Sequence, residues 1–203
     1  MSHAVPVSEF FRYHGLWAPG IRLFRKVNFS VKATLISLVF IVPLCWVSWQ
    51  YFTDKAAAIA FSAKERDGIT YARATLPVLM ALHEQQDPAD KLNALRKAHE
   101  ELGESLGVKQ AFEALAATSN AADQPDALLT LLAASTDGSN LTLDPDIDTY
   151  YLMDATMFRL PLLADYMARL RVLGTAILQH GQATPTELRA VTELRALAKE
   201  QAH

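Results

Sequence analysis

The chain has 203 residues, of which 51% are hydrophobic and 20% are charged. This length suffices for one helical domain with a hydrophobic core but not for several domains. Residues 1–32 contain five basic residues and one acidic residue, a net charge of +4, so the remainder carries −7 within the total of −3. Basic residues gathered outside the folded part argue against nucleic-acid binding. The only cysteine, Cys45, excludes a disulfide within the chain.

A long apolar segment comes first in chain order. The 21 residues of segment 33–53 carry no charge, and as a helix they extend about 30 Å, the thickness of a hydrocarbon core. Aromatic residues such as Trp46 and Trp49 crowd its far end, as they do at membrane interfaces. A cleaved signal peptide has a shorter apolar region and a small-residue cleavage site, so the sequence favours a retained anchor. Pro43 predicts a kink that a membrane helix tolerates.

The charges that flank this segment predict its orientation. Five basic residues precede it, whereas acidic and basic residues are mixed from Asp54 onward. Because Lys and Arg are enriched on the cytoplasmic side, the N-terminus is expected in the cytoplasm. The predicted organisation is a basic cytoplasmic tail over 1–32, a transmembrane helix over 33–53 and an outer domain over 54–203.

The outer domain is expected to consist of helices. Residues 54–86 contain no strong stop, although Gly68 and Pro77 are weak points. A second helix is expected to begin at Asp87, which can cap it, with Pro88 at the first helical position. The apolar residues of this second helix follow the spacing of a bundle seam, with His99 between them: Leu92, Leu95, Leu102 and Leu106.

The rest of the chain is expected to form helices separated by polar breaks. In order, these elements are a short helix over 108–117, a loop over 118–125, a helix over 125–135, a break over 136–140, a long helix from Asp144 or Asp146 to about His180, and a last helix after 183. Pro161 is expected to bend the long helix. Thr184 to Glu187 form a capping box with proline at the first helical position. The predicted fold is all-α, with one transmembrane helix continuing into an antiparallel four-helix-type bundle.

Two stretches carry a family resemblance. Residues 14–44 (HGLWAPGIRLFRKVNFSVKATLISLVFIVPL) resemble the start of bacterial methyl-accepting chemotaxis proteins, and residues 139–171, with their YYLMD run, resemble a stretch of the same receptors' sensor regions. Sensor histidine kinases and diguanylate cyclases carry similar stretches. The resemblance implies a homodimer in the bacterial inner (cell) membrane, with a periplasmic sensor domain over 54–203. Such receptors continue into a second membrane helix, a relay module and an output domain. This domain is therefore expected to be truncated at its C-terminal end, and the alternative is a natural short relative with no signalling output of its own.

Two clusters are candidates for binding a ligand. Arg66, Thr70 and Arg73 share one face of the first outer helix, with Tyr71 beside it. Two guanidinium groups two turns apart can hold a small carboxylate, and aspartate-type chemoreceptors are similar in placing arginines on this helix. The alternative is a solvated face that pairs with neighbouring acidic residues.

The second cluster surrounds the start of the long helix. Asn140, Tyr150, Tyr151 and Asp154 combine polar groups with aromatic walls, which suits a pocket between helices. The alternative is capping by the aspartates and core packing by the tyrosines. The acidic run lacks the ligand spacing and glycine of a calcium loop.

The remaining motifs do not predict chemistry. His83, His99 and His180 lie far apart and belong to no paired-ligand motif, and no phosphate-binding glycine loop or nucleophile motif occurs. No catalytic residue, metal or cofactor is therefore predicted, and the protein is not expected to be an enzyme.

The residues and the resemblance together predict the sensor region of a transmembrane chemoreceptor. It is expected to bind a small solute, an organic acid or amino acid, and to relay a helix displacement across the membrane. Three alternatives stay open: the same sensor attached to a histidine kinase or diguanylate cyclase, a docking module for a periplasmic binding protein, and a structural anchor. Large exposed apolar patches would favour docking, and a closed bundle would favour the anchor.

Overall fold

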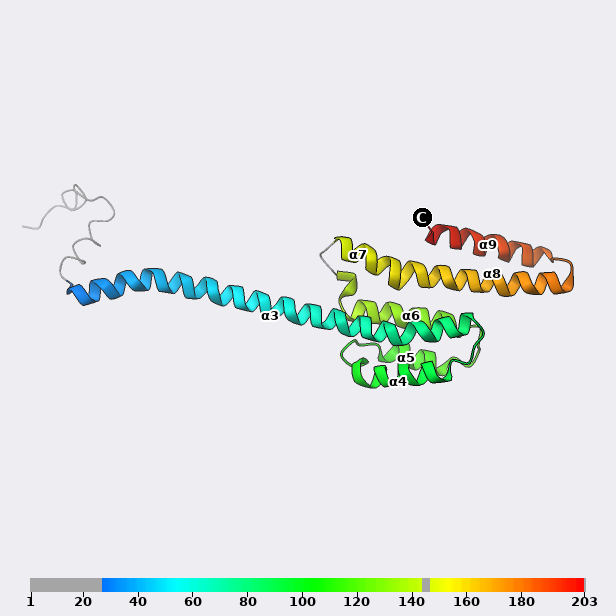
Figure 1. Cartoon of the computed structure of the whole chain (residues 1–203), viewed down its shortest axis with the longest axis horizontal. Helices are drawn as coiled ribbons and strands as arrows, with labels where there is room; N and C mark the ends of the chain where they lie inside the picture. The colour runs from blue at the N-terminus through cyan, green and yellow to red at the C-terminus, as the bar shows by residue number, and fades with distance from the viewer. Residues whose placement is uncertain (1–26, 144–146, 203) are drawn as a thin grey trace, which may run out of the picture. The chain divides into compact units, whose positions relative to one another are not determined.

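The computed structural model describes residues 27–143 and 147–202, and within these ranges the regular structure is entirely helical (Figure 1). This confirms the all-helical prediction for that part of the chain. The elements are α3 (Phe29–His83), α4 (Ala89–Leu102), α5 (Lys109–Ala117), α6 (Gln124–Gly138), the 3₁₀ turn η2 (Leu141–Leu143), α7 (Ile147–Met153), the π-helix η3 (Asp154–Arg159), α8 (Leu160–His180) and α9 (Pro185–Gln201). The chain divides into two compact units, residues 1–57 and 58–203.

The first unit contains the apolar part of α3. This helix has 55 residues and runs through Pro43 without interruption. Its apolar side chains are exposed on all sides, for example Phe40 at 72% and Trp49 at 69%. Exposed apolar surface of this extent is unfavourable in water. The helix is long and apolar enough to cross a membrane. Most of the predicted basic tail, residues 1–26, lies outside the described residues.

The second unit is built around one hydrophobic core. The end of α3 contributes Tyr71, which is fully buried, and three neighbouring helices pack against it. Each fully buried Leu or Val stabilises such a core by about 1.5–3 kcal/mol. Of the apolar residues predicted for the second helix, Leu95 is buried and Leu92 and Leu102 pack at the edge of the core, whereas Leu106 is buried but lies beyond Leu102, where α4 ends. The buried residues of the core are Tyr71, Val78, Leu79, Leu95, Leu106, Val108, Leu115, Leu128 and Leu131.

Two small residues allow α3 and α6 to approach each other closely. Gly68 is buried in α3, and a Cβ added there would lie within 3.0 Å of both the Oγ and the Cβ of Ser139. Ser139 follows the last residue of α6 and donates its hydroxyl hydrogen to the Thr136 carbonyl (3.0 Å). The glycine that the sequence marks as a weak point therefore serves packing.

α6 is longer than predicted. Residues 136–138, expected in a polar break, continue the helix to Gly138. The hydroxyl groups of Ser135 and Thr136 are buried and donate to the Leu132 carbonyl at 2.8 Å each. Because these polar side chains are satisfied by their own helix, they can be buried without ending it. The predicted break is therefore wrong at residues 136–138, whereas residues 139–140 do lie between α6 and η2.

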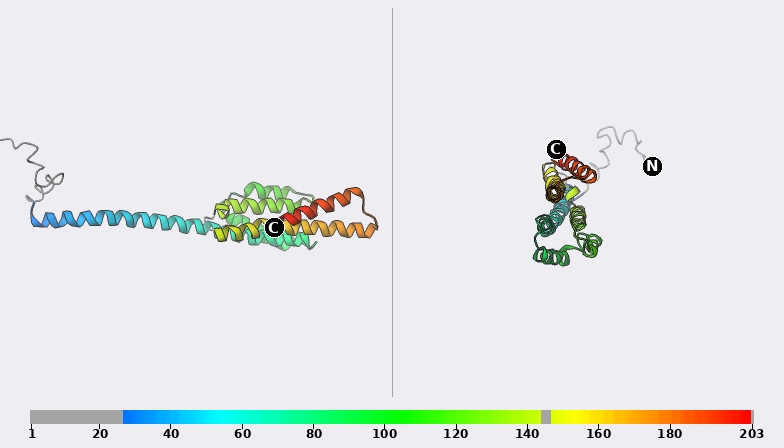
Figure 2. Two further views of the ribbon diagram at one scale, coloured as in Figure 1. Left: turned by 90° about the horizontal axis from the view of Figure 1, so that it is seen from above. Right: turned by 90° about the vertical axis from the view of Figure 1, so that its right-hand side faces the viewer.

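The C-terminal part forms a helical hairpin in which α8 and α9 lie side by side (Figures 1 and 2). Pro161, the second residue of α8, lacks an N–H group and crowds the preceding turn, and the π-helix η3 ends directly before α8. α8 ends at His180 as predicted, with Gly181 in the left-handed conformation (φ 76°). The capping box of α9 is confirmed: Thr184 Oγ1 accepts from Glu187 N (3.2 Å), and Glu187 Oε2 accepts from Thr184 N (2.7 Å).

Candidate functional site

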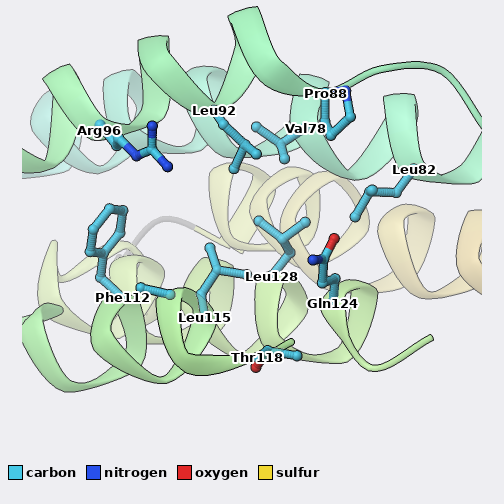
Figure 3. Close-up of a pocket in the computed structure, with 11 residues that line it drawn as sticks. Val78, Leu82, Pro88, Leu92, Arg96, Phe112, Leu115, Thr118, Gln124 and Leu128 are labelled. Atoms are coloured by element: carbon cyan, nitrogen blue, oxygen red, sulfur yellow. The ribbon is translucent and has the colours of Figure 1, made fainter. Parts of the chain in front are cut away.

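A cavity of about 180 Å³ lies between the helices of the second unit (Figure 3). Its wall on α3 is formed near the C-terminal end of that helix, and α4, α5 and α6 supply the other walls. The lining residues are Val78, Leu82, Pro88, Leu92, Arg96, Phe112, Leu115, Ala116, Thr118, Gln124 and Leu128. Small-molecule sites are typically hollows of this kind, with apolar walls and few polar groups.

Arg96 is the charged group of the cavity wall. It projects from α4, with its guanidinium group on the same side as Phe112 in Figure 3. Its Nη1 donates a hydrogen bond to Asn93 Oδ1 (3.1 Å), and it forms no ion pair with any residue in the described ranges. A guanidinium group has five N–H donors. Most of the donors of Arg96 are therefore available to a bound group.

The aromatic wall of the cavity packs on a polar pair formed by the half-buried His99 and the buried Tyr71. Phe112 stacks on the His99 ring, with centroids 3.8 Å apart and planes at 7°. His99 Nδ1 is hydrogen-bonded to the Tyr71 hydroxyl (3.1 Å). Burial lowers the pKa of His99, whereas the carboxylates of Glu113 and Glu100 act in the opposite direction. Burial also raises the pKa of Tyr71. Both rings are therefore favoured in their neutral forms beside the cavity.

A buried carboxylate connects the end of α3 to α8. Asp165 is only 1% exposed, and its Oδ1 accepts from His83 Nε2 (3.1 Å) while its Oδ2 accepts from Arg169 Nε (2.7 Å). Arg169 also pairs with Asp126 of α6, and Arg171 donates to the His83 carbonyl. These charge-assisted hydrogen bonds join α3, α6 and α8. They have defined directions, which hydrophobic packing alone does not provide.

The predicted arginine cluster lies on the exposed side of α3. Arg66, Thr70 and Arg73 are exposed, and the Thr70 hydroxyl donates to the Arg66 carbonyl (2.8 Å). Tyr71, grouped with them on the sequence, is fully buried and its hydroxyl is bonded to His99. The structure therefore separates Tyr71 from its three neighbours in sequence. Ligand contact at these positions stays a prediction.

The second predicted cluster combines two half-buried residues, Asn140 and Asp154, with two exposed tyrosines. Asn140 adopts a left-handed conformation (φ 65°) directly after α6. Tyr150 and Tyr151 meet edge to face, with centroids 6.0 Å apart, and both are exposed. Asp154 accepts from Arg159 Nε (2.6 Å) within the π-helix. None of the eight predicted residues lines the cavity, and Asp144 and Asp146 lie outside the described residues.

The cavity residues were not singled out by their sequence pattern. Arg96 stands next to the buried Leu95, in a helix rich in charged residues, so solvation is the simplest expectation for it. One signal was available: Phe112 is the only Phe, Trp or Tyr between Tyr71 and Tyr150. A lone aromatic residue in a helical segment indicates a position where the large surface of its ring packs against neighbouring side chains.

The fold and the cavity define an all-helical protein, over the residues described, with one helix long enough and apolar enough to cross a membrane and a helical unit that has a small, partly open hollow between its helices. No protein-family model, curated protein or solved structure matches the chain.

Proposed function

We propose that the chain is the anchor and sensor region of a transmembrane chemoreceptor of the methyl-accepting type. In this proposal residues 33–53 cross the inner membrane with the N-terminus in the cytoplasm, and residues after about 54 form an antiparallel four-helix-type sensor bundle in the periplasm. The bundle acts in a homodimer and has no catalytic activity. A small solute binds between helices, and its binding displaces α3 along or about its axis.

One observation carries this proposal. α3 is a single uninterrupted helix that contains both the apolar segment 33–53 and two residues of the cavity wall, Val78 and Leu82. A change in the position of these two side chains is therefore a change in the same continuous helix that contains the apolar segment. A ligand shifts such a helix only by its difference in affinity for the two positions.

The experiment uses the whole chain in lipid nanodiscs and a panel of small carboxylates and amino acids. A ligand at about one hundred times its dissociation constant adds about 2.7 kcal/mol of stability. For a chain of this size the unfolding midpoint, followed by circular dichroism, then rises by roughly 5–10 °C. A saturable rise for one compound supports a sensor. A cooperative melt that no compound moves contradicts direct sensing.

The relay across the membrane has its own measurement. Cys45 is the only cysteine and is exposed in the apolar segment, so oxidative cross-linking between two copies reports their proximity there. In a Cys45→Ser background, single cysteines at positions 44, 46 and 47 sample one helical turn. We expect cross-linked dimer at one or two of these positions and a change in its rate when the stabilising solute is added. An unchanged rate at every position contradicts the relay.

Docking of another protein is the second candidate, and a separate observation favours it. A hollow of about 500 Å³ lies between the end of α3 and α8, lined by residues that include the exposed Met80 and Met167. Methionine-rich apolar surfaces adapt to protein partners. Met80→Glu places a charge in this hollow and leaves the cavity wall intact. If Met80→Glu still binds the solute but no longer changes its cross-linking rate, docking at this hollow is favoured over direct sensing.

A further inference from the structure

The size of the cavity selects the size of its occupant. Its volume is about 180 Å³, whereas an apolar cavity of about 150 Å³ in another protein holds one benzene molecule. One six-membered ring, or a branched chain of four or five carbons, therefore fits between Val78, Leu115 and Leu128. Larger solutes with several charged groups do not fit and would lose their hydration against these walls.

The charge of the cavity selects the chemistry of its occupant. The wall contains one charged side chain, Arg96, and the lining includes no acidic residue. The rest of the wall consists of apolar side chains and two neutral polar ones, Thr118 and Gln124, and the Thr118 hydroxyl already donates to the Ala114 carbonyl (2.8 Å). A planar guanidinium group binds a carboxylate through two parallel hydrogen bonds. A cationic occupant would find no carboxylate in this lining and would lie near the positive charge of Arg96.

From these observations we infer that the cavity binds a small monocarboxylate with an apolar ring or branched body, and that Arg96 holds its carboxylate. This inference rests on the proposed function, whose solute site it assigns to residues other than the arginine face of α3. The body of the ligand lies against Phe112 and the leucines, and it contacts α3 through Val78 and Leu82.

The test is a calorimetric titration of the whole chain in lipid nanodiscs with sodium benzoate, sodium 3-methylbutanoate and neutral benzamide. We expect one site per chain for the two carboxylates, and at least tenfold weaker binding of benzamide, because a hydrogen bond to a charged group is stronger than a neutral one. Arg96→Gln should weaken benzoate about tenfold or more and leave benzamide unchanged. Lys97→Gln removes the same charge from the neighbouring position on α4, outside the cavity wall, and should leave both unchanged.

Two further variants fill the cavity. Ala116→Phe introduces a ring from an exposed position of α5 that lines the cavity, and Leu92→Phe does so from α4. Circular dichroism identifies which of them keep the native helix content. Every folded cavity-filling variant should lose benzoate and 3-methylbutanoate binding.

Three results would overturn the inference: no saturable binding of either carboxylate, equal weakening by Arg96→Gln and Lys97→Gln, or undiminished binding in a folded cavity-filling variant. A failure of the sensor proposal can be distinguished from a failure of this inference by the following results. If another solute of the panel stabilises the chain while the two monocarboxylates do not bind, the ligand class is wrong and the sensor proposal stands. If benzoate binds as expected but the cysteine cross-linking rates do not change, the cavity site stands and the relay is wrong.

Discussion

Two glycines in helix interiors offer a matched pair of substitutions with opposite expected signs. At Gly174 in α8 an added Cβ meets nothing within 4 Å, whereas at Gly68 in α3 it overlaps Ser139. Ala is about 1 kcal/mol better than Gly inside a helix, so Gly174→Ala should stabilise the folded state by about that amount. At Gly68 one obstructing atom is the Cβ of Ser139, which is bonded directly to the backbone and cannot rotate away. Overpacking of this kind costs about 3 kcal/mol.

After the gain in helix propensity is subtracted, Gly68→Ala should destabilise the chain by about 2 kcal/mol. In detergent micelles, the thermal midpoint from circular dichroism at 222 nm should fall by about 4–8 °C, whereas Gly174→Ala should raise it by about 2–4 °C. Ser139→Gly in the Gly68→Ala background should restore part of the loss, because it removes both obstructing atoms. A rise in the midpoint for Gly68→Ala alone would refute the close approach of α3 and the end of α6.

Three further substitutions test the polar contacts. Asp165→Ala leaves His83 and Arg169 without their buried carboxylate, so the free energy of unfolding measured with urea should fall by about 3 kcal/mol. Asp126→Asn, at a half-exposed ion pair, should lower this free energy by less than about 1 kcal/mol. Thr184→Ala removes the capping box, so amide hydrogen exchange in the first turn of α9 should become roughly fivefold faster, with α8 unchanged. Burial lowers the pKa of His99 below its ordinary value of about 6.5. The neutral ring therefore stabilises the fold at pH values above about 6.5, and this stabilisation is lost as the pH falls through the lower folded-state pKa. The loss of stability between pH 7 and pH 5 should therefore be smaller in His99→Gln, and an identical loss would contradict the burial.

The helix boundaries were largely predictable because a few local residues determine them. The capping box at Thr184 and the end of α8 at His180 depend on side chains and a glycine within three residues. α4 begins at Ala89 with Pro88 as its N-cap, one residue later than predicted, and Asp87 Oδ1 accepts from Ala89 N (3.0 Å) just before it. The end of α6 was not predictable in this way, because Gly138 and Ser139 lie close to Leu106 and Gly68, which are far away in sequence.

The cavity could not be predicted for a related reason. Its walls come from four helices and the connections between them, and the space left open depends on how their side chains meet. The periodicity of each helix identifies the side that is buried, but not where two buried sides fail to fill the volume between them. Arg96 is an example of a cavity residue that periodicity does not identify. It is exposed and stands beside a buried leucine, so it has the pattern of a solvated residue.

The two candidate arginine sites differ in whether they need a second copy of the chain, and binding measurements can distinguish them. Arg66 and Arg73 are exposed on α3, so a ligand held by them needs a second surface to exclude water, which a partner copy could provide. The cavity beside Arg96 is lined by helices of one chain, so a ligand held there needs no second copy. Binding at the arginine face should therefore strengthen as the number of chains per nanodisc rises from one to two, whereas binding in the cavity should not change. Benzoate that binds single-chain and two-chain nanodiscs with equal affinity would assign sensing to the cavity, and a requirement for two chains would assign it to the face of α3.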